Sequence, residues 1–294
     1  MQVDVAFITV NYNTCGLVKE LVSFFNSVLL PFSFRLVVVD NASCDGSHEY
    51  LSGISMPELI YVQTNENLGY GRGMNRGLSM VDSRYACIMN TDLILNQEAL
   101  VALWEFFQAD PQAGVATPLI RGADGRQQGF IFHPGILSLY SSFICKIRSK
   151  RWKRRVEQSN APVLVPGVLG AFFMIRRSLF GNTLFDEDFF FYYEDTELAH
   201  RYWQTGMKCC VLPEVSIVHL GGQSTSASGG RLFQISRRLY VLKVYGEHHA
   251  FFVNGFDRLR LYGKCLKYHF LNLICPTEKI RSKSEFYRRL LQHD

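Results

Sequence analysis

The first 110 residues alternate short apolar runs with stretches of helical periodicity, and the apolar runs end in polar or acidic residues. This alternation, with short connections, predicts a parallel sheet with right-handed crossovers. Open sheets of this kind bind ligands at the carboxyl ends of their strands, so functional residues are expected there. Strands are predicted at Val5–Asn11, Phe34–Asp40, Leu59–Thr64 and Tyr85–Asn90, and helices at Gly16–Val28, Ser47–Gly53, Asn75–Val81 and Gln97–Ala109.

The pattern loosens after residue 115. Further strands are predicted at Val115–Arg121, around Gly167 and Gly170 within Val163–Arg176, and at Lys208–Leu212 leading to His219, with a helix at Glu194–Thr205. The Gly/Ser-rich segment Gly221–Gly230 is typical of a mobile loop or a linker. We therefore predict an α/β chain: a Rossmann-like, mostly parallel central sheet flanked by helices in residues 1–226, and a basic amphipathic helical region in 227–294.

Composition excludes several classes of protein. A hydrophobic content of 48%, with 14% aromatic residues, argues against disorder. Eight cysteines without a CxxC pair fit reduced thiols better than a disulfide framework or a zinc site. The N-terminal residues lack the basic region of a signal peptide, and no apolar run reaches the roughly 18 residues that span a bilayer. A cytoplasmic location is expected.

Charge is distributed unevenly along the chain. Residues 231–294 hold 13 basic and 5 acidic residues, a net charge of +8, whereas residues 1–230 hold 18 basic and 21 acidic residues, a net charge of −3. Seven bases also cluster between Lys146 and Arg155 without an acid. This asymmetry predicts an anionic partner that binds at particular parts of the chain. A nucleic-acid partner is not expected. The C-terminal segments fit helices on an anionic membrane surface, or ordinary helices with solvated bases. The run at 146–155 contacts lipid headgroups or an anionic ligand, or is a solvated loop.

Two acidic residues at predicted strand ends are candidates for ligand binding. Asp92, in Asn90-Thr91-Asp92, suits an Mg²⁺ or Mn²⁺ ion that bridges carboxylate and phosphate oxygens. Asn96 can cap the next helix, which leaves Asp92 for a ligand. Asp40 either accepts the imide N–H of a pyrimidine base or caps a turn. His219 either completes a metal shell or is structural.

Glu194-Asp195 is the candidate general base, because it follows five consecutive aromatic residues, Phe189 to Tyr193. An apolar wall raises a carboxyl pKa and excludes water. The alternative is an acidic first helical turn favoured by the helix dipole. The glycine- and amide-rich turn before Asn75 suits contact with ribose or phosphate. The glycines at 69, 71 and 73 have the wrong spacing for a GxGxxG dinucleotide motif.

Taken in order, these segments resemble family-2 glycosyltransferases of the GT-A fold, and among them the bacterial rhamnosyltransferase-like enzymes of surface-polysaccharide assembly. The resemblance spans roughly residues 3–226. It is carried by Ile8-Thr9-Val10-Asn11-Tyr12-Asn13, Val38 to Gly46, Asn65 to Asn75, Met89-Asn90-Thr91-Asp92, Gly167 to Arg176, Glu194-Asp195-Thr196-Glu197-Leu198 and His219 to Ser224.

The resemblance implies roles for individual residues. Asp195, with Glu194 as the competing choice, would be the base of an inverting displacement, and Asp92 with His219 would bind Mg²⁺ or Mn²⁺. Donor contacts would come from Asn11, Asp40, Asn41, Asn67, Gly69, Arg72, Asn75 and Asn90, and acceptor contacts from Gly170 and Ala171. Asn90 replaces the first acid of a strict DxD motif, and Gly71-Arg72-Gly73 occupies a usually alanine-rich stretch.

The resemblance also suggests substrates. The preferred donor is dTDP-L-rhamnose, and UDP-linked glucose, galactose or N-acetylglucosamine is the alternative. The acceptor would be a saccharide, free or carried on a polyprenyl diphosphate, which places a peripheral enzyme on the inner face of the plasma membrane. A non-catalytic component of a polysaccharide assembly complex is the alternative from another class, although intact Asp92, Asp195 and His219 argue against it.

Overall fold

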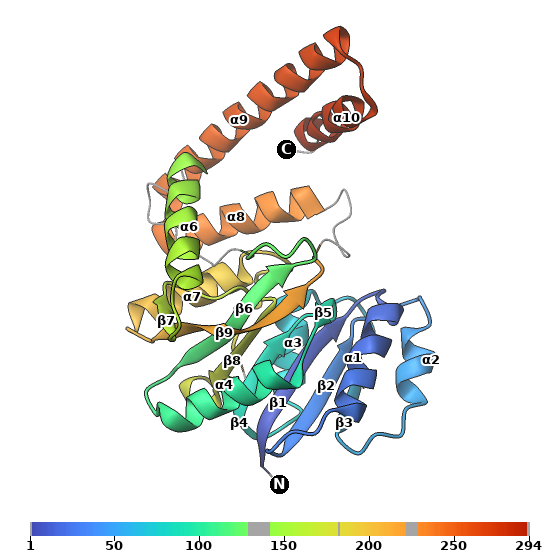
Figure 1. Ribbon diagram of the computed structural model, residues 1–294. Helices are drawn as coiled ribbons and strands as arrows, with labels where there is room; N and C mark the ends of the chain where they lie inside the picture. The colour runs from blue at the N-terminus through green and yellow to red at the C-terminus, as the bar shows by residue number, and fades with distance from the viewer. Residues whose placement is uncertain (1, 129–141, 182, 222–228, 293–294) are drawn as a thin grey trace. The chain divides into compact units, whose positions relative to one another are not determined.

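The computed structural model describes residues 2–128, 142–181, 183–221 and 229–292 (Figure 1). These residues form two compact units. The first contains the described residues 2–128 and 143–221, and the second contains residues 229–292. The predicted mobile segment Gly221–Gly230 falls mostly outside the described residues. The seven cysteines whose side chains the structure describes are all free thiols: Cys15, Cys44, Cys87, Cys209, Cys210, Cys265 and Cys275.

The first unit is built on one sheet, which has nine strands in the described part of the chain. Their order is β3-β2-β1-β4-β8-β6-β9-β5, with β7 also paired to β9. The strands are β1 (Val3–Asn11), β2 (Phe34–Asp40), β3 (Leu59–Gln63), β4 (Ser83–Met89), β5 (Leu93–Ile94), β6 (Val115–Gly122), β7 (Val163–Val165), β8 (Phe172–Arg176) and β9 (Cys209–His219).

Strand direction divides this sheet. The strands β1 to β4 are parallel, whereas β8 runs antiparallel to both β4 and β6, and β9 returns parallel to β6. The α/β class with parallel N-terminal strands is confirmed. The insertion of β8 between β4 and β6 was not predicted, because the segment Val163–Arg176 carries no signal of direction. The structure divides that segment into the short strands β7 and β8.

Helices cover both faces of the sheet (Figure 1). The helices α1 (Cys15–Ser27), α2 (Ser47–Ser52) and α4 (Gln97–Ala109) contribute to one apolar core. The helices α3 (Tyr70–Leu78) and α7 (Glu194–Gln204) contribute to the core on the other face. The result is a helix–sheet–helix sandwich whose strand ends carry the candidate site residues.

Helix α3 begins at Tyr70, five residues before the predicted start at Asn75. Its glycines face the sheet: a Cβ atom on Gly73 would lie 2.7 Å from Val10 Cγ2, and one on Gly77 would lie 2.6 Å from Ile8 Cγ2. Glycine therefore allows this helix to approach β1 closely. Gly77 lies within the predicted helix Asn75–Val81, whereas Gly73 was predicted to lie in the turn before it.

The basic run between Lys146 and Arg155 lies on helix α6 (Ser142–Glu157), so its interpretation as a solvated loop was wrong. Val156 is fully buried and packs in the same core as α3 and α7. Lys153 Nζ donates to the backbone oxygen of Gln127 at 2.7 Å. One end of this basic helix is thus fixed to the segment that follows β6.

The second unit consists of α8 (Gly229–Tyr245), α9 (Glu247–Ile274) and α10 (Glu278–Gln292). Arg237 of α8 pairs with Asp257 of α9 (Nε–Oδ2 2.7 Å), and the rings of Tyr268 and Tyr287 stack between α9 and α10. Among the described helices, none combines the length and apolar character required to cross a membrane.

Candidate active site

The carboxyl ends of β1 and β2 meet at Asn11 and Asp40, which are register partners. Asn11 Nδ2 donates to Asp40 Oδ1 at 2.7 Å, and the Ser43 hydroxyl donates to the same oxygen at 2.5 Å. The Ser43 amide reaches Asp40 Oδ2 at the longer distance of 3.3 Å. Asp40 is fully buried and holds the turn after β2, which matches the turn-capping alternative. Its second oxygen keeps most of its capacity to accept a further hydrogen bond.

Asn41, Asn67 and Gly69 form one cluster beside this turn. Asn41 Nδ2 donates to the Gly69 carbonyl at 2.9 Å, and the Gly69 amide donates to Asn67 Oδ1 at 2.9 Å. Gly69 has φ +81° and touches the backbone of Phe190, so no other residue fits there. Asn41 Oδ1 is buried without a hydrogen-bond partner among the described residues. It is therefore an acceptor next to Asp40 that remains open to a ligand.

Asn75 and Arg72 contact the chain segment before α7. The Asn75 oxygen accepts from the Leu184 and Phe185 amides at 2.9 and 3.0 Å, and its nitrogen donates to the Phe185 carbonyl. Arg72 is exposed and donates from Nε to the Glu187 carbonyl at 2.8 Å. Both side chains hold this segment in place, so neither contact supports the predicted donor role.

The predicted metal ligands Asp92 and His219 lie together. Strand β5 pairs with β9 at Leu93 and His219, and Asp92 Oδ1 is 3.2 Å from His219 Nε2. Asp92 Oδ2 accepts from the Gly221 amide at 3.1 Å, and Asn90 Nδ2 lies 3.3 Å from the same His219 nitrogen. Burial raises the pKa of Asp92, but the hydrogen bond and positive charge of His219, when Nε2 also carries a proton, and the hydrogen bond from the Gly221 amide bring this pKa below its ordinary value.

Gln128 completes this group, and the sequence analysis missed it. Its Oε1 lies 2.6 Å from His219 Nδ1, and its Nε2 donates to the His219 carbonyl at 2.9 Å. Because Oε1 only accepts, His219 Nδ1 must carry a proton. The other ring nitrogen, Nε2, therefore faces Asp92 Oδ1. The position of Gln128 follows from pairing of Gly122 with His219 and from the turn after β6.

A divalent cation fits between Asp92 and His219. A carboxylate oxygen and an unprotonated ring nitrogen 3.2 Å apart repel each other unless a proton or a cation lies between them. Mn²⁺ and Mg²⁺ accept such a pair and take further oxygens from substrate phosphates and water. Within the described residues, no group of three or more His, Cys, Asp or Glu side chains gathers around a metal position.

The two carboxyls at the start of α7 differ in environment. Glu194 is 6% exposed, and its Oε2 has no hydrogen-bond partner among the described residues. Burial, and next the charge of Asp195, raise the pKa of Glu194 well above its usual value. Asp195 is half-buried and accepts from the Gly170 amide at 3.2 Å and from the Thr196 hydroxyl at 3.3 Å. Burial also raises the pKa of Asp195, but these donors oppose the shift. Asp195 is therefore the carboxyl that ionises more readily.

Gly170 and Ala171 connect this pair to the end of β4. A Cβ atom on Gly170 would lie 3.0 Å from Asp195 Cβ, so a larger residue here would require Asp195 to shift by a few tenths of an ångström. The Ala171 carbonyl accepts from the Asn90 amide at 2.9 Å. Their backbone groups thus position Asp195 and Asn90. Direct contact with an acceptor stays a prediction for both.

Tyr70 is a second residue that the sequence analysis missed. Its hydroxyl donates to the Gly170 carbonyl at 2.7 Å. Burial, followed by the charges of Glu194, Asp195 and Asp92, raises the pKa of Tyr70 well above its usual value. The phenol therefore stays protonated and holds the Gly170 carbonyl, while the Gly170 amide donates to Asp195.

The backbone before α7 is strained. Tyr192 and Tyr193 have φ values of +69° and +67°, a conformation that bulky residues rarely adopt. Strain of this kind costs roughly 1–3 kcal/mol per residue and concentrates at functional sites. The two residues directly precede Glu194 and Asp195, so the strain belongs to the turn that orients the candidate base.

Comparison with known proteins identifies the family. Residues 6–184 match the model of glycosyl transferase family 2. The chain belongs to this family. The chain is also similar to an N-acetylglucosaminyl-diphospho-decaprenol L-rhamnosyltransferase of Mycobacterium tuberculosis (strain ATCC 25618 / H37Rv), with 27% identity over 213 residues. The aligned region covers 65% of this chain and 67% of the relative. The predicted family membership is confirmed.

Solved structures support the fold of this family-2 member. A mannosyltransferase from Pyrobaculum calidifontis, in complex with GDP-Man and Mn²⁺, superposes with a TM-score of 0.58 at 15% identity, covering 99% of this chain and 86% of that one. GalNAc-T7 with UDP, GalNAc and Mn²⁺ has a TM-score of 0.56 at 15% identity, covering 82% of this chain and 50% of that one. At this identity the likeness establishes the GT-A fold alone.

Proposed function

We propose that this glycosyltransferase moves a sugar from a nucleoside diphosphate to a saccharide acceptor with inversion at the anomeric carbon, and that Asp195 is the base. The observation that carries this proposal is the contrast at the start of α7. Glu194 is buried and keeps its proton, whereas Asp195 is half-buried and receives hydrogen bonds from Gly170 and Thr196. Asp195 is thus the carboxyl of the pair that ionises more readily, and a half-buried carboxylate beside a buried acid suits proton abstraction.

The transfer step forms one bond and breaks another at the anomeric carbon of the sugar. The acceptor hydroxyl oxygen forms a bond to the anomeric carbon and loses its proton to Asp195. The bond between that carbon and the diphosphate oxygen breaks, and its electron pair leaves with the diphosphate. Tyr70 and Gly170 hold the Asp195 carboxylate in place during this step.

Asp92 and His219 would hold a divalent cation, which supplies positive charge for the leaving diphosphate when bound. Gln128 keeps the His219 ring oriented for this role. At the other end of the donor, Asp40 Oδ2 and Asn41 Oδ1 are the acceptors open to a pyrimidine imide or amino group. The remaining donor contacts would come from the Asn67–Gly69 turn and Asn90.

The donor is proposed to be dTDP-L-rhamnose and the acceptor a saccharide carried on a polyprenyl diphosphate, in the assembly of a bacterial surface polysaccharide. The relative from M. tuberculosis, named as an L-rhamnosyltransferase for a diphospho-decaprenol acceptor, supports this choice. The basic helix α6 also supports an acceptor with a diphosphate, because Lys153 joins it to the residue next to Gln128. GalNAc-T7, solved with UDP, favours a UDP-sugar as the second candidate donor.

Calorimetric titration of dTDP and of UDP, each with and without Mn²⁺, tests the proposal on the wild type and Asp92→Ala. We expect one nucleotide to bind, with at least tenfold loss of affinity when Mn²⁺ or Asp92 is removed. Asp82→Ala is the matched control, because Asp82 is an exposed carboxylate that directly precedes β4, at the end of this strand opposite to Asp92. Absence of nucleotide binding under every condition would instead support the non-catalytic alternative.

A further inference from the structure

One face of helix α9 is strongly apolar and exposed. Phe252, Leu259, Leu266 and Leu273 recur every seven residues, which is about two helical turns, and are 63–68% exposed. Phe256 and Phe270 are exposed on the same face. Soluble proteins rarely expose a continuous apolar stripe of this length without a binding partner.

The opposite face of α9 already packs within the second unit. Ala250, Val253 and Leu261 are buried there. Asp257 pairs with Arg237 of α8, and Tyr268 stacks on Tyr287 of α10. The apolar stripe (Phe252, Phe256, Leu259, Leu266, Phe270 and Leu273) is therefore not the surface that holds the three helices together.

Bases flank the apolar stripe. At 100° per residue, Arg260 and Lys267 lie along one edge of it and Arg258 along the other. The sequence contains no acidic residue from 258 to 277. The charge around the stripe is therefore positive on both sides.

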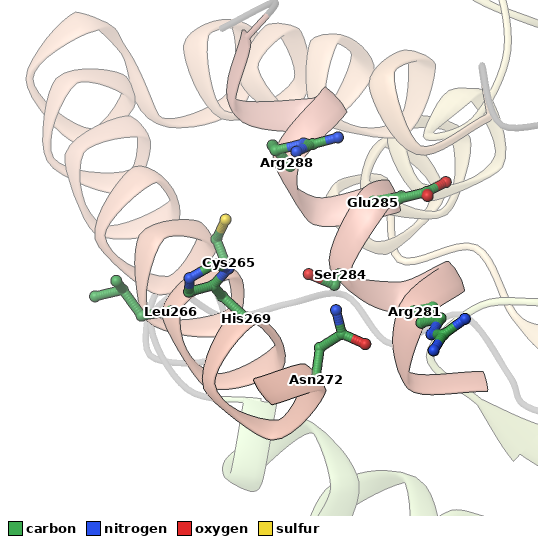
Figure 2. Close-up of a pocket in the computed structure, with 8 residues that line it drawn as sticks. All are labelled: Cys265, Leu266, His269, Asn272, Arg281, Ser284, Glu285 and Arg288. Carbon is green, nitrogen blue, oxygen red and sulfur yellow. The ribbon is translucent and has the colours of Figure 1, made fainter. Parts of the chain in front are cut away.

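The cleft between α9 and α10 extends this positive region (Figure 2). Leu266 of the stripe lines it together with Arg281 and Arg288 of α10, and Glu285 is the acidic residue among the side chains that line it. Two further guanidinium groups thus line a cleft whose wall also includes Leu266 of the stripe.

We propose that the apolar stripe of α9 docks on a bilayer surface that contains anionic lipids, with the helix lying in the interface. The apolar side chains would enter the boundary between headgroups and acyl chains, and the flanking bases would contact lipid phosphates. A second copy of this chain fits less well, because a symmetric pair would bring like bases together at the edges of the stripe. This surface is distinct from the proposed sugar-transfer site.

Co-sedimentation of the full chain with vesicles tests the proposal. We expect binding to phosphatidylglycerol-containing vesicles that weakens with salt, and much weaker binding to pure phosphatidylcholine. Leu259→Ser and Leu266→Ser should each weaken binding about tenfold or more. Arg260→Gln and Lys267→Gln should each weaken binding to the anionic vesicles about fivefold.

Matched controls come from the first unit. Leu29→Ser removes a leucine that is 81% exposed, and Arg76→Gln removes an exposed base of α3, and both variants should bind like the wild type. Equal binding of the wild type and the Leu259→Ser/Leu266→Ser double variant would overturn the proposal. A concentration-dependent dimer that the double variant abolishes, without vesicle binding, would overturn it in favour of a second copy. Nucleotide titration on the same variants reports separately on the sugar-transfer site.

Discussion

The side chain of Gln128 and residue His219 are joined by two hydrogen bonds, one at the ring nitrogen Nδ1 (2.6 Å) and one at the backbone carbonyl (2.9 Å). The second bond fixes which end of the amide faces the ring, and the first then requires a proton on Nδ1. The other ring nitrogen, Nε2, points at Asp92 Oδ1, 3.2 Å away. A single glutamine thus sets both the orientation and the tautomer of the histidine.

Gln128→Met should therefore weaken Mn²⁺ binding about 10- to 100-fold, the usual effect of losing a residue that orients a metal ligand. Methionine keeps the length of the side chain but cannot hold the His219 ring by hydrogen bonds. Electron paramagnetic resonance of Mn²⁺ with the bound nucleotide measures the affinity directly. Gln112→Met, at an exposed position, is the control. Unchanged Mn²⁺ affinity in Gln128→Met would show that His219 is oriented without Gln128.

The two carboxyls of α7 should respond differently to neutralisation. Asp195→Asn should lower the rate of transfer about 10²- to 10⁴-fold, because it removes the base, and leave nucleotide affinity nearly unchanged. Glu194→Gln should keep most of the activity, since its carboxyl already carries a proton in the wild type. Turnover of the sugar nucleotide with a saccharide acceptor measures both variants. The assignment would have to be reversed if Glu194→Gln were the inactive one.

The raised pKa of Glu194 predicts how stability depends on pH. The folded chain keeps this proton at pH values where the unfolded chain, with a pKa near 4.5, has lost it. The contribution of Glu194 to stability is therefore full below pH 4.5 and is lost as the pH rises through the folded pKa. The glutamine side chain of Glu194→Gln does not titrate. The free energy of unfolding of this variant should therefore increase relative to that of the wild type as the pH rises.

Urea unfolding of both proteins between about pH 5 and pH 8 measures this difference. The two curves of unfolding free energy against pH should diverge steadily with rising pH. Parallel curves over this range would mean that Glu194 has the same pKa in the folded and unfolded chains. Arg76→Gln, which changes an exposed side chain of α3, is the control, and its curve of unfolding free energy against pH should be parallel to that of the wild type.

The sequence predicted the parts of the site that follow from strand ends. Because parallel strands end at one edge of a sheet, the proximity of Asn11 and Asp40 could be expected before the structure. The same reasoning placed Asp92 and His219 as a pair, and their side chains are 3.2 Å apart. Periodicity was also sufficient for most strands and for helices such as α4, whose predicted and observed ends coincide.

The residues that the sequence did not predict act through contacts between distant segments. Gln128 reaches His219 across 91 positions, and Tyr70 reaches Gly170 across 100. Gln128 belongs to no motif. Tyr70 lies in the segment Asn65–Asn75, but nothing in the spacing of that segment indicates a partner 100 residues away. The early start of α3 was missed for a related reason: Gly73 is required by the close approach to Val10, which only tertiary packing reveals.

Gly170→Ala tests whether the position of Asp195 governs transfer. The new methyl carbon would lie 3.0 Å from Asp195 Cβ and 3.1 Å from its Oδ2, so the Asp195 side chain must shift by a few tenths of an ångström. Displacing a catalytic group by about 1 Å costs roughly 10²-fold in rate, and overpacking costs about 1–3 kcal/mol of stability. We expect the smaller shift to lower transfer about threefold to tenfold, with nucleotide affinity retained because the Asp92–His219 pair is unchanged.

Gly181→Ala provides the matched control, because a Cβ atom there meets no other atom within 4 Å. It should leave both the rate and the melting temperature close to wild-type values. The decisive comparison is the rate at a temperature well below the melting temperature of Gly170→Ala, where a folded protein is measured. A Gly170→Ala protein that is folded and fully active would mean that transfer does not depend on the observed position of Asp195, because its side chain must shift to admit the alanine methyl.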